Sequence, residues 1–309
     1  MVSDTNRTAL SKILIAAAFA LSLVACSTGQ TIGSATEPAP GPALWALGDD
    51  DTTIYLFGVA PVLKTGTEWE TATITDAFNT ADLFIIESEN SSPEAQASVQ
   101  ALIPQIGLNT DGSTLSSKLS KEEQAELNAI STDLGAPLRA LDTLKPWLAS
   151  IQLGVLSISQ DNYDIANPPA VQLVTRAAAE GKMMRSLEGP TVLLTVMSKF
   201  SEDEQIGMLM HQARTLRDAP TQQTELADAW LGGDVQKIGD ILHGDGAWSS
   251  EVVYDTMLVQ RNKAWLDELI SLLADHDGTI FVTVGLGHLS GEDSLIEMLS
   301  DAGYAVHRQ

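Results

Sequence analysis

Residues 279–289, which read TIFVTVGLGHL, constrain the fold more than any other stretch of this chain. Their apolar and β-branched side chains predict a buried strand, which ends near Gly285 and is followed by a helical pattern. His288 would then lie just beyond the carboxyl end of the strand. Because open α/β sheets usually bind their ligands at the carboxyl ends of the strands, His288 is the first candidate site residue.

Further strands are predicted near both ends of the chain and in its middle. Residues 43–47 and 53–59 are apolar stretches separated by Gly-Asp-Asp-Asp, which is typical of a β-hairpin. Three more strands are predicted over residues 83–87, 183–187 and 304–307. The first two of these strands place the carboxylates of Glu87 and Glu188 at their ends.

Most of the remaining chain has a helical pattern. Ser-x-x-Glu sequences predict helix starts at Ser120 and Ser201. The longest predicted helix covers residues 252–274, and a last helix covers residues 291–299. The sequence therefore predicts an α/β (mixed α+β) fold. Its central mixed sheet is built from N-terminal and C-terminal strands, with a large helical insertion between them.

The charge and the cysteine count exclude some classes of function. The chain has 17 basic and 41 acidic residues, and its net charge is −24. Because so acidic a surface repels phosphate backbones, we expect no nucleic-acid partner. The acidic residues are scattered, as on solvated faces. A single cysteine, Cys26, allows neither an internal disulfide nor a Cys-rich zinc site.

The N-terminus has the pattern of a secretion signal. Arg7 and Lys12 precede an apolar run, residues 13–25, which is long enough for a signal-peptide core and too short to span a bilayer. The run ends in Leu-Val-Ala-Cys-Ser, which resembles a bacterial lipobox with cleavage before Cys26 and acylation of that cysteine. An ordinary signal peptide with an incidental cysteine is the alternative. Because the only cysteine stands at this position, we predict a lipoprotein held at the membrane by its N-terminal lipid.

The chain is expected to divide into three parts. Residues 1–25 are the predicted lipoprotein signal peptide. Residues 26–43 contain the lipidated cysteine and a tether rich in Ser, Thr, Gly and Pro, which has too little apolar surface to fold. Residues 44–309 form the folded domain. The expected location is the bacterial cell envelope, facing the periplasm, and these residues do not distinguish the inner from the outer membrane.

Several short motifs recur in a characteristic order along the domain. They are ALW at 43–45, IYLFG at 54–58, ADLFIIE at 81–87, LKPW at 144–147, LE at 187–188, RNKAW at 261–265, VGLGHL at 284–289 and GYAV at 303–306. Together these motifs resemble the TraB/GumN family, which is grouped with the Tiki-type proteins. The resemblance implies a mixed α/β fold and a metal-dependent hydrolase or peptidase centre. In the family, this centre is built from two Gly-x-x-His motifs and a strand-end glutamate.

The chain matches the family's site motifs only in part. Gly285 and His288 match the second Gly-x-x-His motif, and Glu87 matches the glutamate. The first motif starts at Gly58 but ends at Pro61, so proline stands where the family has histidine. No other histidine lies in this part of the chain, and a shifted alignment cannot replace the missing ligand.

The candidate metal site is therefore poor in ligands. A catalytic metal generally needs three protein ligands and an open position. His288, Glu87 and Glu188 are the candidates, with Glu89 or Asp82 as further oxygen donors. Mn, Co or Zn is the implied cofactor, and a metal such as Mn²⁺ could tolerate the oxygen-rich set. The missing histidine predicts weaker binding, so no cofactor is certain.

Arg261, on the longest predicted helix, has two interpretations. It could clamp a substrate carboxylate, as a catalytic residue beside His288 and Glu87. Alternatively, it pairs with buried glutamates, since an unpaired buried charge is costly. The other histidines lie in polar surroundings without ligand spacing, and we expect them at the surface: His211, His243, His276 and His307.

Two functions follow from these patterns. The first is a lipid-anchored hydrolase that acts on a peptide or envelope substrate, with His288 and Glu87 as metal ligands or acid–base groups. The second is a catalytically silent family member that keeps the fold to bind a ligand or protein in the envelope. Pro61 favours the second function.

Overall fold

The structure is a computed structural model that describes residues 25–26, 41–160 and 162–309. Nearly all of the predicted signal peptide, residues 1–25, and most of the predicted tether, residues 26–43, lie outside the described residues. Cys26 is described by its backbone alone. It belongs to β1 (Ala25–Cys26), which pairs with β6 (His243–Gly244).

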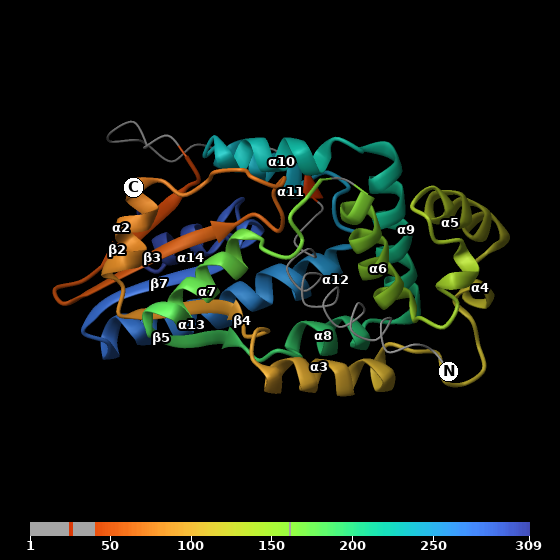
Figure 1. The fold of residues 1–309 in the computed structure, drawn as a ribbon, viewed down its shortest axis with the longest axis horizontal. Coiled ribbons are helices and arrows are strands. Elements are labelled where there is room, and N and C mark those ends of the chain that lie inside the picture. The colour runs from red at the N-terminus through yellow and green to blue at the C-terminus, as the bar shows by residue number, and fades with distance from the viewer. Residues whose placement is uncertain (1–24, 27–40, 161) are drawn as a thin grey trace.

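A six-stranded sheet forms the centre of the described chain (Figure 1). Its strands lie in the order β5 (Met183–Glu188), β4 (Leu83–Ser88), β7 (Gly278–Gly285), β3 (Thr52–Val59), β2 (Leu44–Gly48) and β8 (His307–Arg308). The first four strands run parallel, whereas β2 is antiparallel to both of its neighbours. The N-terminal hairpin thus pairs with strands from the C-terminal end, which confirms the predicted mixed sheet and the mixed α/β fold.

Helices cover both faces of the sheet. Because side chains alternate along a strand, Phe281 of β7 points to one face, whereas Ile280 and Val282 point to the other. The face of Phe281 packs against α2 (Ala72–Thr80), α7 (Pro169–Glu180), α10 (Gln222–Leu231) and α11 (Val235–Leu242). The opposite face packs against α13 (Gln260–Asp275) and α14 (Leu295–Asp301). Burial on both faces explains why β7 reads as a nearly continuous apolar run.

A helical region lies beside the sheet and confirms the predicted insertion (Figure 1). It contains α3 (Pro93–Ile106), α4 (Leu115–Lys118), α5 (Lys121–Asp133), η1 (Leu138–Ala140), α6 (Pro146–Gln160), α8 (Val192–Lys199) and α9 (Glu202–Asp218). These helices bury apolar clusters of their own, separate from those of the sheet. Ser120 and Ser201 form the predicted capping boxes, with Glu123 and Glu204.

The longest predicted helix is present but irregular. The helix α12 (Glu251–Tyr254) continues through a π turn, η2 (Asp255–Val259), into α13. The π turn ends directly before the first turn of α13, where Arg261 lies. Such turns often occur at functional sites, because they change the direction in which the following side chains point.

The last elements begin later than the sequence predicted. After β7 the chain forms a 3₁₀ turn, η3 (Leu286–Leu289), and α14 begins at Leu295 instead of residue 291. Gly291 has a φ of +80°, which a right-handed helix does not allow. The last strand pairs with β2 only over His307–Arg308, and the predicted range of 304–307 was too early.

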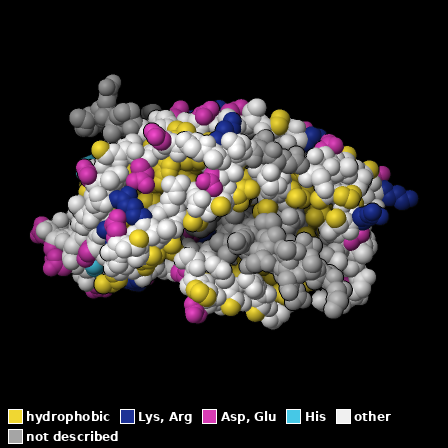
Figure 2. Space-filling model, viewed as in Figure 1, with side chains coloured by type: hydrophobic (Ala, Val, Ile, Leu, Met, Phe, Trp, Pro, Cys, Tyr) yellow, Lys and Arg dark blue, Asp and Glu magenta, His cyan; other side chains and the backbone are white. Residues whose placement is uncertain are grey.

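No helix within the described ranges is long and apolar enough to cross a membrane. Figure 2 shows acidic side chains spread over several parts of one face, with basic side chains between them.

Candidate functional site

Four of the predicted site residues meet at one edge of the sheet. Glu87 lies near the carboxyl end of β4, Glu188 ends β5, and His288 lies in η3 directly after β7. Since these three strands are parallel neighbours, their carboxyl ends share an edge. Arg261 reaches the same place from α13, which covers one face of the sheet. Glu87, Glu188, Arg261 and His288 are called the arginine cluster below.

Arg261 is the centre of the arginine cluster. Its Nη2 donates to Glu87 Oε1 at 2.6 Å and to Glu188 Oε2 at 3.1 Å, while its Nε donates to Glu188 Oε1 at 2.8 Å. Its Nη1 donates to the carbonyl oxygen of Met257 at 3.1 Å and contacts His288 Nε2 at 3.2 Å. These contacts use all five N–H groups of the guanidinium. Arg261 is therefore the structural partner of the two glutamates, and no donor is left for a substrate carboxylate.

Glu87 is fixed at both of its carboxylate oxygens. Oε1 accepts from Arg261, and Oε2 accepts the backbone N–H of Gly285 at 2.8 Å. Burial alone would raise the pKa of Glu87. The charge of Arg261 and the hydrogen bonds outweigh burial, so the pKa lies below its ordinary value. Glu87 is thus held as a carboxylate.

His288 is buried and neutral. Its Nδ1 lies 2.6 Å from Asn262 Oδ1, while the amide nitrogen of Asn262 donates to the carbonyl oxygen of Asp293 at 2.7 Å. This network assigns the proton to Nδ1, so Nε2 offers its lone pair to Arg261. Burial and the charge of Arg261 lower the pKa of His288 to about 3. Sequence reasoning missed Asn262, although it directly follows Arg261 in the RNKAW motif.

His243 supports the turn that carries His288, and its prediction as a surface residue was wrong. It is partly buried, and its Nε2 contacts the carbonyl oxygen of Gly287 at 2.9 Å and Ser290 Oγ at 3.1 Å. Gly291 makes this approach possible, because a Cβ there would lie 2.7 Å from the His243 ring. The polar sequence around His243 gave no sign that the end of α11 packs against η3.

The other predicted surface histidines differ in exposure. His307 is exposed, as expected, whereas His211 and His276 are partly buried. His276 pairs with Asp82 at 3.2 Å. None of the three contacts the arginine cluster through a described hydrogen bond.

Two of the suggested oxygen donors are not in the arginine cluster. Asp82 lies just before β4, at the opposite end of the strand from Glu87, and accepts the backbone N–H of Thr279 at 2.9 Å. The carboxylate of Glu89 accepts hydrogen bonds from Ser91 and Ser92 before α3. The carboxylate of Asp82 therefore connects the start of β4 to the start of β7, whereas that of Glu89 stabilises the turn before α3.

The first family motif keeps its glycine for a packing reason. A Cβ on Gly58 would lie 3.0 Å from the Cα of Leu286, so glycine lets β3 approach the turn that carries His288. The carbonyl oxygen of Gly58 also accepts from the indole of Trp230 at 2.6 Å. Pro61 is buried just beyond β3 and has no side-chain atom that could bind a metal.

Comparison with protein families agrees with this arrangement. The model of the TraB/PrgY/gumN family matches residues 43–308, which is nearly the whole predicted domain. The chain belongs to the TraB/PrgY/gumN family. Searches of curated proteins and of solved structures gave no match.

The donor set of this TraB/PrgY/gumN protein does not fit a metal ion in the present conformation. Within the described residues, no three His, Cys, Asp or Glu side chains are placed to hold one. Arg261 already contacts His288 Nε2, Glu87 Oε1 and both carboxylate oxygens of Glu188. Pro61 adds no ligand. We therefore derive no metal-dependent step for this site.

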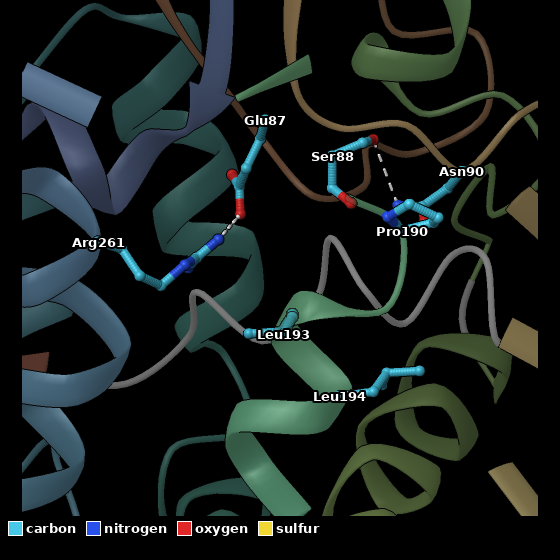
Figure 3. A pocket seen from close by; sticks show the side chains of 7 residues that line it. All are labelled: Glu87, Ser88, Asn90, Pro190, Leu193, Leu194 and Arg261. Atoms are coloured by element: carbon cyan, nitrogen blue, oxygen red, sulfur yellow. Dashed lines mark hydrogen bonds and ion pairs between the residues drawn. The ribbon is translucent and has the colours of Figure 1, made fainter. Parts of the chain in front are cut away.

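The space beside the arginine cluster is small. Glu87 and Arg261 line a narrow cavity, together with residues from the end of β4 and just after it, and from the start of α8 and the turn before it: Ser88, Asn90, Pro190, Leu193 and Leu194 (Figure 3). The cavity has room for about one water molecule. Figure 3 shows the Glu87 carboxylate turned towards the guanidinium, away from Leu194.

Proposed function

We propose that this TraB/PrgY/gumN protein is a lipid-anchored envelope protein with a degenerate hydrolase site, which keeps the family fold to bind a ligand or protein. The observation that carries this proposal is that every N–H donor of Arg261 already has an acceptor within the protein. Each of its N–H groups is bound inside the protein, and its partners include every carboxylate and imidazole of the site. A substrate would have to break this buried network before it could be bound there.

The protonation of the arginine cluster also supports a silent site. General acid–base catalysis works best when the pKa of the catalytic group lies near the working pH. The pKa of His288 is lowered to about 3, and that of Glu87 lies below its ordinary value. Neither group exchanges a proton readily near neutral pH.

A hydrolase is the second candidate, and the position of the site favours it. The arginine cluster lies at the carboxyl ends of three parallel strands, where enzymes with open α/β sheets bind substrates. In this alternative, His288 and Glu87 are catalytic, and Arg261 moves away when a peptide or envelope substrate binds.

Metal content separates the two candidates. The mature protein is extracted in detergent, without chelator, and compared with His288→Ala after incubation with Mn²⁺, Co²⁺ or Zn²⁺. A silent site predicts no more bound metal in the wild type than in the variant. Near-stoichiometric metal that is lost in His288→Ala would instead support the hydrolase and justify a screen of envelope peptides.

The membrane anchor is a proposal from the N-terminal sequence. Arg7, Lys12, the apolar run and Cys26 have the order of a lipoprotein signal. Labelling of cells with radioactive palmitate tests it. We expect label in the wild type and none in Cys26→Ser, which should also leave the membrane fraction. Equal labelling of both proteins would contradict the anchor, and fractionation of inner and outer membranes would assign the location.

A further inference from the structure

We propose that Met183 is a site of reversible oxidation, at which a peroxide converts the thioether to methionine sulfoxide. This modification does not depend on the function of the arginine cluster. It depends on the position of β5 in the sheet, on the direction in which its first side chains point, and on the burial of the other methionines.

Met183 begins β5, which is an edge strand of the six-stranded sheet (Figure 1). On one side, β5 pairs with β4, and Met183 lies opposite Leu83. No strand within the described residues pairs with the other side of β5. A small dissolved molecule can therefore approach β5 from the side that has no neighbouring strand.

The two methionines at the start of β5 point to opposite faces of the sheet, because side chains alternate along a strand. Met184 packs against the apolar cluster around Phe281 and is partly buried. Met183 points to the face of α13, on which Arg185 pairs with Glu268. Met183 itself is 63% exposed. Of the two neighbours, Met183 is thus the one that a dissolved oxidant reaches.

The other methionines of the described chain are less accessible. Met298 on α14 is partly buried, as Met184 is. Because an oxidant must reach the sulfur atom, the rate of oxidation follows exposure. We therefore expect Met183 to react first and the partly buried methionines to follow. Four methionines are buried and should react only when the fold opens: Met197, Met208, Met210 and Met257.

The reaction transfers one oxygen atom to Met183. Its sulfur attacks a peroxide oxygen, an S–O bond forms, and the O–O bond breaks. The thioether loses two electrons, and hydrogen peroxide is reduced to water. The product is a polar sulfoxide, which a methionine sulfoxide reductase converts back to the thioether. At an exposed position the added polarity costs little, whereas the same change at Met184 would oppose its contacts with the core.

Mild oxidation of the mature full-length protein tests the proposal. The protein, in peroxide-free detergent, is treated with hydrogen peroxide, and the sulfoxide at each methionine is followed over time by mass spectrometry of peptides. Fragmentation of the peptide that contains both residues separates Met183 from Met184. Met183→Leu and the matched control Met298→Leu are treated in the same way. Thermal unfolding of the singly oxidised protein measures the cost of the modification.

We expect Met183 to be oxidised faster than Met197 and Met257 by about tenfold or more, because buried sulfurs react only through opening of the fold. This difference should vanish in the unfolded protein. Met183→Leu should take up its first oxygen several-fold more slowly than the wild type, whereas Met298→Leu should match the wild type. The first oxygen should change the melting temperature by no more than about 2 °C, as for other exposed positions.

Three results would overturn the proposal. The first is oxidation of Met184 or Met298 as fast as that of Met183 in the folded protein. The second is an unchanged rate of first oxygen uptake in Met183→Leu. The third is a fall of many degrees in melting temperature after the first oxygen, which would show that Met183 is packed and not open to solvent.

Discussion

The hydrogen bond between Asn262 and His288 determines which ring nitrogen of His288 faces Arg261. The Asn262 amide is fixed by the carbonyl oxygen of Asp293, so its own oxygen must receive the Nδ1 proton of His288. Asn262 directly follows Arg261 on α13. The helix therefore presents both partners of the histidine, one at each ring nitrogen.

Loss of this contact should change the tautomer of His288. In Asn262→Leu, the buried Nδ1–H and the carbonyl oxygen of Asp293 lose their partner, which we expect to cost about 1–3 kcal/mol. Nitrogen-15 NMR of His288 should show a reduced population of the Nδ1–H tautomer. Asn262→Asp keeps an acceptor and should retain that tautomer. The exposed Asn167→Leu is the control, and an unchanged NMR spectrum in Asn262→Leu would contradict the assignment.

The ion pairs of the arginine cluster should matter far more than those of the surface. Glu87→Gln leaves Arg261 paired with Glu188, but the new amide N–H group must face another donor, either Nη2 of Arg261 or the N–H of Gly285. We expect this buried mismatch to lower the free energy of unfolding by about 1–3 kcal/mol. Glu268→Gln breaks the exposed pair with Arg185 and should cost about 0–1 kcal/mol. Chemical denaturation measures both, and similar losses would show that the buried pair has no special role.

Acid should destabilise the fold through its buried histidines. Burial lowers the pKa of His288 to about 3 and that of His243 to about 4, from an ordinary value of 6.5. Between each lowered pKa and 6.5, the unfolded chain binds a proton at that histidine that the folded chain does not bind. The free energy of unfolding therefore falls as the pH drops below 6.5. Each histidine contributes a slope of about 1.4 kcal/mol per pH unit. Below pH 4.5 the lowered pKa of Glu87 adds to the loss, because its stabilising charge disappears as the pH falls through the folded pKa.

Between pH 6.5 and 4, His288→Gln should therefore reduce the slope of the free energy of unfolding against pH by about 1.4 kcal/mol per pH unit, which corresponds to one proton. His307→Gln, at an exposed position, is the control. Denaturation curves at a series of pH values measure the slope. An equal slope in the wild type and in His288→Gln would mean that His288 is protonated in the folded protein.

Gly58 should resist even the smallest substitution. A Cβ in Gly58→Ala would lie 3.0 Å from the backbone of Leu286 and push η3 away from β3. We expect a loss of about 1–3 kcal/mol, as for other overpacked sites. In Gly154→Ala in α6, the Cβ would lie 3.8 Å from Nε2 of Gln212, an ordinary contact, so this change should instead stabilise by about 0.5–1 kcal/mol. Thermal unfolding of the two variants gives the comparison, and a neutral Gly58→Ala would refute the close packing.

Restoring the missing family histidine should not be sufficient for metal binding. Pro61→His supplies an imidazole just beyond β3, but Arg261 still contacts His288 Nε2 and Glu87. Elemental analysis after incubation with Mn²⁺, Co²⁺ or Zn²⁺ should therefore find no bound metal. Stoichiometric metal in Pro61→His alone would show that the arginine yields its place to a competing cation.

Local patterns in the sequence predicted most of the elements. The apolar run of β7, the turn between β2 and β3, and the capping boxes at Ser120 and Ser201 depend on residues close together in the chain. The same local patterns placed Glu87 and Glu188 at strand ends and His288 beyond β7. The late start of α14 was missed, because the conformation of Gly291 is set by its packing against His243.

The sequence by itself therefore determined the strands, most of the helices and the residues that reach the carboxyl edge of the sheet. The tertiary structure alone decided that Arg261, 174 positions after Glu87, fills the space between these residues. It also decided that Asn262 and His243 support the turn of His288. The reason is physical: periodicity depends on near neighbours, whereas the pairing of buried charges depends on strand register and on how α13 packs across the sheet.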